Sequence, residues 1–191
     1  MEKNRILMLT ESAIMIALAT VLSFVKIFSM PAGGSVTLLS MLPIIIIAYR
    51  YGVLWGMCTG GVYGILQLLL GLSSLRGVSA ITFIGSLFFD YVLAFAALGL
   101  AGLFKNKIQN RVVAISLGAA FGIFGRFVFS FLSGLILWGD IAGDGFIASV
   151  ISSAVYNGTY LGPELLITAI MVAVLSSFLD FSQKNLRPVS A

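Results

Sequence analysis

Long apolar runs alternate with short polar or glycine-rich breaks along the whole chain, and most runs are as long as a bilayer-crossing helix. About 20 consecutive apolar residues span the hydrocarbon core of a membrane. The breaks lie at 29–35, 49–52, 73–77, 105–111 and 139–145. The pattern predicts six transmembrane helices in one domain covering 1–191, at about 6–28, 37–49, 53–72, 80–104, 112–138 and 146–179.

Six spans place both ends of the chain on one side of the membrane, and the basic residues agree with that arrangement. Eight of the eleven Lys and Arg residues then share one side: Lys3, Arg5, Arg50, Lys105, Lys107, Arg111, Lys184 and Arg187. The other side holds Lys26 and Arg76 with Asp140 and Asp144. Because cytoplasmic loops carry an excess of Lys and Arg, both termini are predicted to be cytoplasmic. Glu11 interrupts the first run, which exceeds a signal-peptide core, so we expect a retained helix.

Composition confirms the class that the pattern predicts. The chain is 60% hydrophobic and 9% charged, whereas soluble domains carry about 45–50% apolar and about 25% charged residues. An all-α integral membrane protein is therefore expected, and a cytosolic enzyme or a nucleic-acid-binding domain is excluded. The net charge of +4 is attributed to cytoplasmic loops. With no His, a single cysteine at Cys58 and no phosphate-binding loop, the chain offers no expected metal site, cofactor or ATPase motif.

Small residues recur at intervals of four in three predicted helices. They are Ala13 and Ala17, then Gly52, Gly56, Gly60 and Gly64, then Gly118 and Gly122. Such spacing lets a neighbouring helix approach closely. For the glycines we expect contacts inside the bundle, whereas the alanine pair leaves open a contact with another protein.

Three charged residues lie inside predicted spans: Asp90, Arg126 and Glu164. A charge at the centre of a membrane helix costs about 2.5–3.5 kcal/mol on insertion scales, so each needs a partner or water. One interpretation is a structural ion pair of Arg126 with Asp90 or Glu164, and the other is a polar cavity that binds a ligand. The two are compatible. These scattered charges do not build a membrane enzyme, but a channel or an ion-coupled transporter using Asp90 or Glu164 remains open.

Aromatic and amide groups gather toward the outer ends of the last two spans. Trp138 closes one span, and Tyr156, Asn157 and Tyr160 lie in the outer half of the next. Trp138 alone is typical of an interfacial belt. Together with Asp90, the group predicts an outward pocket in which a ring stacks on a flat heterocycle and a carboxylate pairs with a cation.

Four stretches resemble the thiamine-specific S-components of energy-coupling factor (ECF) transporters. They are PAGGSVTLLSMLPI at 31–44 followed by YRYG at 49–52, the segment 89–104, the segment 126–134 with Trp138, and the segment YNGTYLGPE at 156–164. The resemblance covers nearly the whole chain, and its glycine-rich and FDY blocks are the more specific parts.

The resemblance implies a six-helix substrate-binding subunit in a prokaryotic plasma membrane, and no enzyme activity. Such a subunit captures thiamine outside the cell and docks on a membrane T-subunit that carries two ATPase subunits. An Ala-x-x-x-Ala face on the first helix meets the T-subunit, and Ala13 and Ala17 match it. A related vitamin, a pyrimidine precursor or an autonomous ion-coupled transporter are the alternatives.

The resemblance also implies a set of ligand-binding residues. Asp90 matches an acid that pairs with the ligand, Trp138 an aromatic that stacks on it, and Asn157 an amide on the sixth helix. Arg126 matches a basic position with a structural role, and Tyr156 and Ser130 complete the expected site. Some members carry other residues at four positions, which leaves open a changed ligand: Gly34, Leu38, Ser130 and Ser152.

Overall fold

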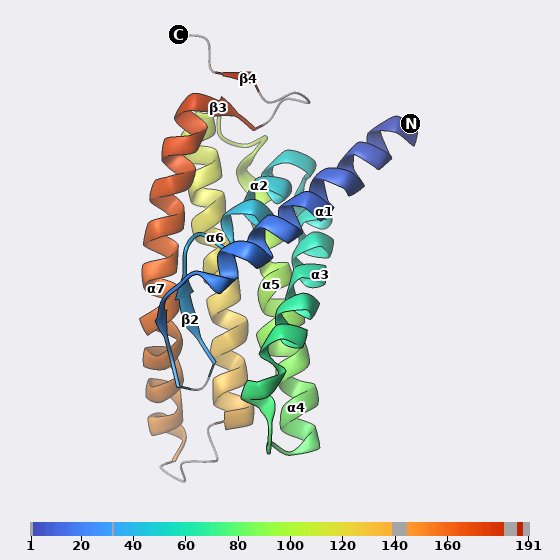
Figure 1. Ribbon diagram of the computed structural model, residues 1–191. Coiled ribbons are helices and arrows are strands. Elements are labelled where there is room, and N and C mark those ends of the chain that lie inside the picture. Colours follow the sequence, from blue (N-terminus) through green and yellow to red (C-terminus); the bar gives the residue numbers. More distant parts are fainter. Residues whose placement is uncertain (1, 32, 139–144, 182–186, 189–191) are drawn as a thin grey trace.

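The computed structural model describes residues 2–31, 33–138, 145–181 and 187–188. Long helices pack side by side, and a small β-hairpin lies against them (Figure 1). The elements are α1 (Glu2–Phe24), β1 (Lys26–Ser29), β2 (Ser35–Thr37), α2 (Leu42–Tyr51), α3 (Val53–Gly71), η1 (Leu72–Leu75), α4 (Ala80–Ser86), η2 (Leu87–Leu93), α5 (Ala94–Ala96), η3 (Ala97–Phe104), α6 (Arg111–Ser133), η4 (Gly134–Trp138), α7 (Phe146–Phe178), β3 (Leu179–Asp180) and β4 (Arg187–Pro188).

Five helical stretches in the described part of the chain are long and apolar enough to cross a membrane: Arg5–Phe24, Val53–Leu75, Ala80–Phe104, Arg111–Trp138 and Phe146–Phe178. They correspond to five of the six predicted spans. The prediction for 37–49 is realised as α2, which has only ten residues and is too short to cross a bilayer on its own.

The segment between α1 and α2 departs most from the sequence prediction. Residues 26–28, expected at the end of the first helix, form strand β1, which pairs antiparallel with β2. Ile27 and Phe28 favour strands as readily as buried helices, and an apolar run alone does not separate the two. The predicted helical start at 37 is also wrong, because Leu39 has a φ of 64° and the helix begins only at Leu42, with Pro43 in its first turn.

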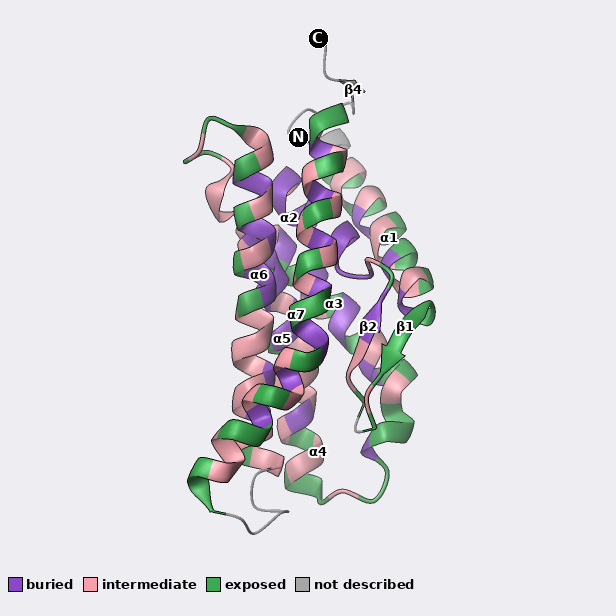
Figure 2. Cartoon of the chain, turned by 90° about the vertical axis from the view of Figure 1, so that its left-hand side faces the viewer, coloured by how far each residue is buried: buried purple, intermediate pink, exposed green. Residues whose placement is uncertain are grey.

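Helix α2 forms the centre of the bundle. Every residue from Leu42 to Arg50 is buried, and Figure 2 shows α2 enclosed by helices whose outer faces are exposed. Its neighbours are α1, α3, η3 and α6. A helix that is apolar on every side belongs inside a larger apolar assembly, which explains how so short a segment is accommodated.

Glycines bring the helices around α2 into backbone contact, as their spacing predicted. A Cβ added at Gly60 would collide with the carbonyl oxygen of Phe95, and one at Gly64 with that of Tyr91. Gly118 lies in the same way against Ala101 of η3. Gly52 is different, because a Cβ there meets nothing within 4 Å and its φ of 98° serves the turn between α2 and α3.

A polar cluster joins α1 to α2 at the end of the bundle where α1 begins and α7 ends (Figure 1). Arg50 Nε lies 2.8 Å from Glu11 Oε2, and the hydroxyl of Tyr51 donates to the same carboxylate. Lys105 Nζ donates to the Arg50 carbonyl over 2.7 Å. Burial, with Arg50 nearby, lowers the pKa of the Lys105 amine. Trp55 Nε1 adds a bond to Ser12 Oγ at 2.9 Å.

Some charges used in the topology prediction lie outside the described residues. They are Asp140, Asp144 and Lys184, and the side chains of Lys3 and Arg187 are likewise not described.

Replacing Gly60 by Ala is expected to lower the free energy of unfolding by about 1–3 kcal/mol, the cost of overpacking a well-filled contact. The matched control is Gly61→Ala, since Gly61 is the next residue of α3 and has nothing within 4 Å of an added Cβ. Thermal unfolding of the purified protein in detergent checks the prediction. Equal midpoints for the two variants would contradict the close α3–α5 contact.

Candidate functional site

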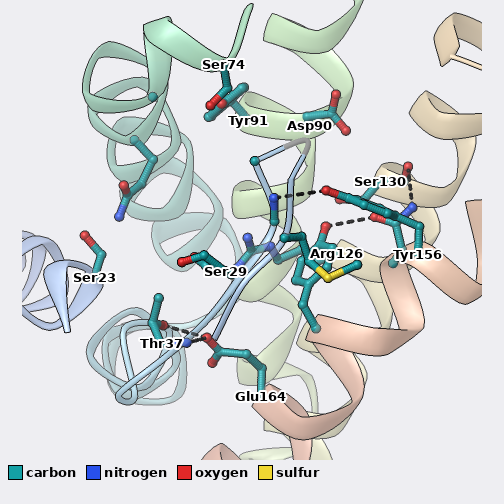
Figure 3. A pocket seen from close by; sticks show the side chains of 18 of the residues that line it. Ser23, Ser29, Thr37, Ser74, Asp90, Tyr91, Arg126, Ser130, Tyr156 and Glu164 are labelled. Carbon is teal, nitrogen blue, oxygen red and sulfur yellow. Dashed lines mark hydrogen bonds between the residues drawn. The ribbon is translucent and has the colours of Figure 1, made fainter. Parts of the chain in front are cut away.

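A cavity of about 590 Å³ lies between the β1–β2 hairpin and helices α3, η2, α6, η4 and α7. Its volume falls in the range of roughly 300–1,000 Å³ that is usual for small-molecule sites. The five residues predicted to bind a ligand all line it: Asp90, Ser130, Trp138, Tyr156 and Asn157. Figure 3 shows Asp90, Ser130 and Tyr156 around the same space. The residues that were grouped from the sequence come from three predicted spans, and in the structure they lie around one cavity.

Asp90 reaches the cavity from η2, a π-helical stretch between α4 and α5. Ser133 Oγ donates to Asp90 Oδ2 over 2.6 Å, which ties η2 to the end of α6. A carboxylate keeps further acceptor sites after one such bond. Asp90 is therefore held in place and still able to accept from, or pair with, a group in the cavity.

Trp138 enters the cavity from a second π-helical stretch, η4, which it ends. π-Helical turns are uncommon and frequently occur at functional sites. Here the two such stretches of the described chain carry the carboxylate and the indole of the predicted pair. Nothing in the sequence pattern distinguished these turns from α-helix.

Asn157 is fixed by neighbours on two helices. Its Nδ2 donates to the Ser153 carbonyl at 3.0 Å and to the Ser130 carbonyl of α6 at 3.3 Å. Its Oδ1 accepts from the Tyr160 hydroxyl at 2.8 Å. An amide oxygen has two lone pairs, so one remains for a ligand while the orientation of the amide is set by the protein.

The expected ion pair of Arg126 with Asp90 or Glu164 is not formed among the described residues. Arg126 instead places its guanidinium over the ring of Phe95, with Cζ 4.0 Å from the ring centroid, and its Nε has no hydrogen-bond partner in the described part of the chain. Glu164 accepts from Thr37. Both side chains line the cavity (Figure 3), and each contacts a different partner.

Other cavity residues were not identified from the sequence. Tyr63 and Gln67 of α3 belong to the wall, and Gln67 Nε2 donates to the Tyr63 hydroxyl, which donates in turn to the Ala19 carbonyl of α1. Thr37 reaches the cavity from the hairpin. Only part of this wall could have been found from the sequence: Tyr63 and Gln67 are spaced one helical turn apart and so lie on one face of α3.

Three of the four positions that depart from the resembled family line the cavity: Gly34, Ser130 and Ser152. All three are small, so they leave space rather than fill it. Leu38 is 41% exposed and is not part of the wall. Among the described residues, no group of three His, Cys, Asp or Glu side chains gathers to hold a metal ion.

The chain matches known proteins over nearly its whole length. Residues 9–183 match the family model described as thiamine transporter protein. A protein named thiamine transporter ThiT from Bacillus subtilis is 34% identical over 186 residues, covering 91% of this chain and 92% of that protein. A second protein of the same name, from Lacticaseibacillus paracasei, is 28% identical over 187 residues, covering 91% and 89%.

The solved structure of ThiT from Listeria monocytogenes resembles the fold, with a TM-score of 0.71 and 26% identity. The likeness covers 90% of this chain and 94% of that one. Together with the five apolar helices, these matches show that the chain belongs to the thiamine transporter protein family, as a multi-pass bacterial membrane protein and not an enzyme.

Proposed function

We propose that this chain is the substrate-binding S-component of an ECF-type importer and that it captures thiamine on the extracellular side. The observation that carries the proposal is the convergence of Asp90, Trp138 and Asn157 on one cavity. Family membership supports the choice of ligand, because the matching relatives are named thiamine transporters.

The chemistry of the cavity suits thiamine, which joins a cationic thiazolium ring to an aminopyrimidine. The carboxylate of Asp90 would pair with the cation or accept from the amino group, and the indole of Trp138 offers a face on which a cationic ring stacks. The free lone pair of Asn157 and the hydroxyl of Tyr156 would set the orientation, and Ser130 lies beside them. No residue in this group is arranged to break a bond.

The proposed topology has six segments, with both ends of the chain in the cytoplasm. Helix α1 begins and α7 ends at the same end of the bundle (Figure 1). Arg50, Lys105 and Arg111 lie at or beside the helix ends there, as the excess of basic residues on cytoplasmic sides predicts. The cavity and the hairpin would then face outward, with the buried α2 as the sixth segment.

We further propose that α1 docks on a membrane T-subunit that carries two ATPase subunits. Ala13 and Ala17 lie one turn apart and are both exposed, so their face of α1 is open to another helix. Small residues at that spacing allow close helix contact inside a membrane. This chain would deliver the bound ligand, and the partner subunits would drive transport with ATP.

A second candidate keeps the fold and changes the ligand to a related vitamin or a pyrimidine precursor. It is favoured by three small residues in the cavity wall, Gly34, Ser130 and Ser152, which leave room for a ligand of a different shape. An autonomous ion-coupled transporter would instead take up its ligand in vesicles that contain no ATPase subunits.

Titration of the purified protein with thiamine is expected to quench tryptophan fluorescence, with riboflavin and the aminopyrimidine half of thiamine as comparators. The quenching should be lost in Trp138→Ala and kept in Trp55→Phe, since Trp55 bonds to Ser12 outside the cavity wall. By calorimetry, Asp90→Asn should bind thiamine at least about tenfold more weakly, because a hydrogen bond to a charged group is worth about 1.5–3 kcal/mol.

Normal thiamine binding by Asp90→Asn would overturn the assignment of the site. A response to a comparator but not to thiamine would favour the second candidate.

Replacing both Ala13 and Ala17 by Leu is expected to abolish copurification with the T-subunit and thiamine uptake by cells, because the larger side chains hold the partner helix away. Thiamine binding by the isolated chain should not change. Gly158→Leu on α7, where nothing lies within 4 Å of an added Cβ, is the control. Uptake at the unaltered rate in the double variant would rule out this docking face.

A further inference from the structure

One face of α7 holds the β1–β2 hairpin at three successive turns. Tyr156, Tyr160 and Glu164 are spaced by four residues and so lie on the same side of the helix. The Tyr156 hydroxyl accepts from Gly34 N at 3.4 Å, and Gly34 lies so close to the Tyr160 ring that an added Cβ would be 2.7 Å from it. Two turns from Tyr156, Glu164 meets Thr37 (Figure 3).

The Glu164–Thr37 contact is the stronger of the two polar contacts. Glu164 Oε1 accepts from both Thr37 N, at 2.5 Å, and Thr37 Oγ1, at 2.6 Å. Ser40 Oγ lies 2.6 Å from Thr37 Oγ1 and supports it. Glu164 is only 2% exposed, so both bonds lie away from water, where a hydrogen bond is electrostatically stronger. The bond from Gly34 to Tyr156 is longer and neutral.

The rest of the hairpin has little to hold it in place. All four residues of β1 are exposed, whereas Val36 and Thr37 of β2 are buried. The hairpin therefore rests on the bundle through β2 and its turn. Ser29, Met30, Gly34 and Thr37 form part of the cavity wall, so a displacement of the hairpin from α7 would open the cavity.

The second oxygen of Glu164 makes the contact with Thr37 more important. Oε2 is buried and has no hydrogen-bond partner among the described residues. The two bonds from Thr37 are then the polar support that this carboxylate has in the described structure. Removing the partner of a buried hydrogen-bonded group is costly, because that group is left without a bond. An opened hairpin would leave Glu164 in that state until water enters.

We propose that Glu164 is a positioning residue that keeps the hairpin closed over the cavity and thereby sets the rate at which bound ligand leaves. Glu164 acts through Thr37 and needs no contact with the ligand. The identity of the ligand rests on the function proposed above, whereas the contact between α7 and the hairpin does not. The two are therefore tested by separate measurements.

The first measurement is the rate of thiamine dissociation, followed by stopped-flow fluorescence in Glu164→Ala, Thr37→Val and the double variant. Each single variant is expected to release thiamine about tenfold faster or more, because it leaves a buried polar group without its partner. The double variant should be no faster than the faster single one, since Glu164→Ala already removes the hydroxyl bond that Thr37→Val removes. Association rates should fall little or not at all.

Conservative variants separate positioning from general stability. Thr37→Ser keeps the hydroxyl and should dissociate more slowly than Thr37→Val, and Glu164→Gln keeps an accepting oxygen and should dissociate more slowly than Glu164→Ala. The matched control is Glu11→Ala, which removes a carboxylate paired with Arg50 outside the cavity wall. It should lower the unfolding temperature and leave the dissociation rate unchanged. Unchanged rates in Glu164→Ala, or additive effects in the double variant, would overturn the proposal.

The second measurement needs no ligand. Val36 of strand β2 is 4% exposed, so a Val36→Cys change in a Cys58→Ser background reports on opening of the hairpin through its rate of reaction with a membrane-impermeant maleimide in lipid nanodiscs. Glu164→Ala should raise this rate about tenfold or more, and Glu11→Ala should not. An unchanged labelling rate would overturn the proposal even if thiamine binds. Faster labelling in a chain that binds no thiamine would support it and overturn only the proposed ligand.

Discussion

Charged side chains inside an apolar bundle need partners, and this requirement organises the half of the molecule that contains the cavity. Asp90, Arg126 and Glu164 have three different partners: a hydroxyl from Ser133, the face of Phe95 and the hairpin through Thr37. Had they paired with one another, their charges would be neutralised within the protein. Because they do not, the cavity keeps a carboxylate and a guanidinium at its wall, and the hairpin is drawn onto the bundle.

Much of the fold was predictable because its signals are local. Apolar runs of bilayer length gave five of the helices to within a few residues at most of their ends, and the four-residue spacing of Gly56, Gly60 and Gly64 indicated the close contact that the structure contains. A row of glycines is informative because it permits close backbone contact with any neighbouring helix. The neighbour itself, the stretch around Phe95, was not predictable from the stripe.

The predictions failed where the partner in space decided the outcome. Residues 26–28 belong to a strand because Ser35–Thr37 pairs with them. An apolar run does not indicate which segment will pair with it. The ion pair of Arg126 was inferred from depth in the membrane alone, whereas side-chain direction also decides which groups meet: Arg126 lies over Phe95 and Glu164 bonds to Thr37. The Glu164–Thr37 contact joins residues 127 positions apart. Its one local sign is the spacing of Tyr156, Tyr160 and Glu164.

Helix α1 is held to the rest of the bundle in two different ways. Close to its middle it is fixed by the Glu11–Arg50 pair and the Ser12–Trp55 bond. At its end it runs directly into the hairpin, where Leu38 N donates to the Val25 carbonyl over 2.9 Å. The exposed Ala13 and Ala17 lie between these points. The helix proposed to meet the partner subunit and the hairpin over the cavity are therefore one continuous segment, held to α2 by an ion pair and to α7 by Glu164.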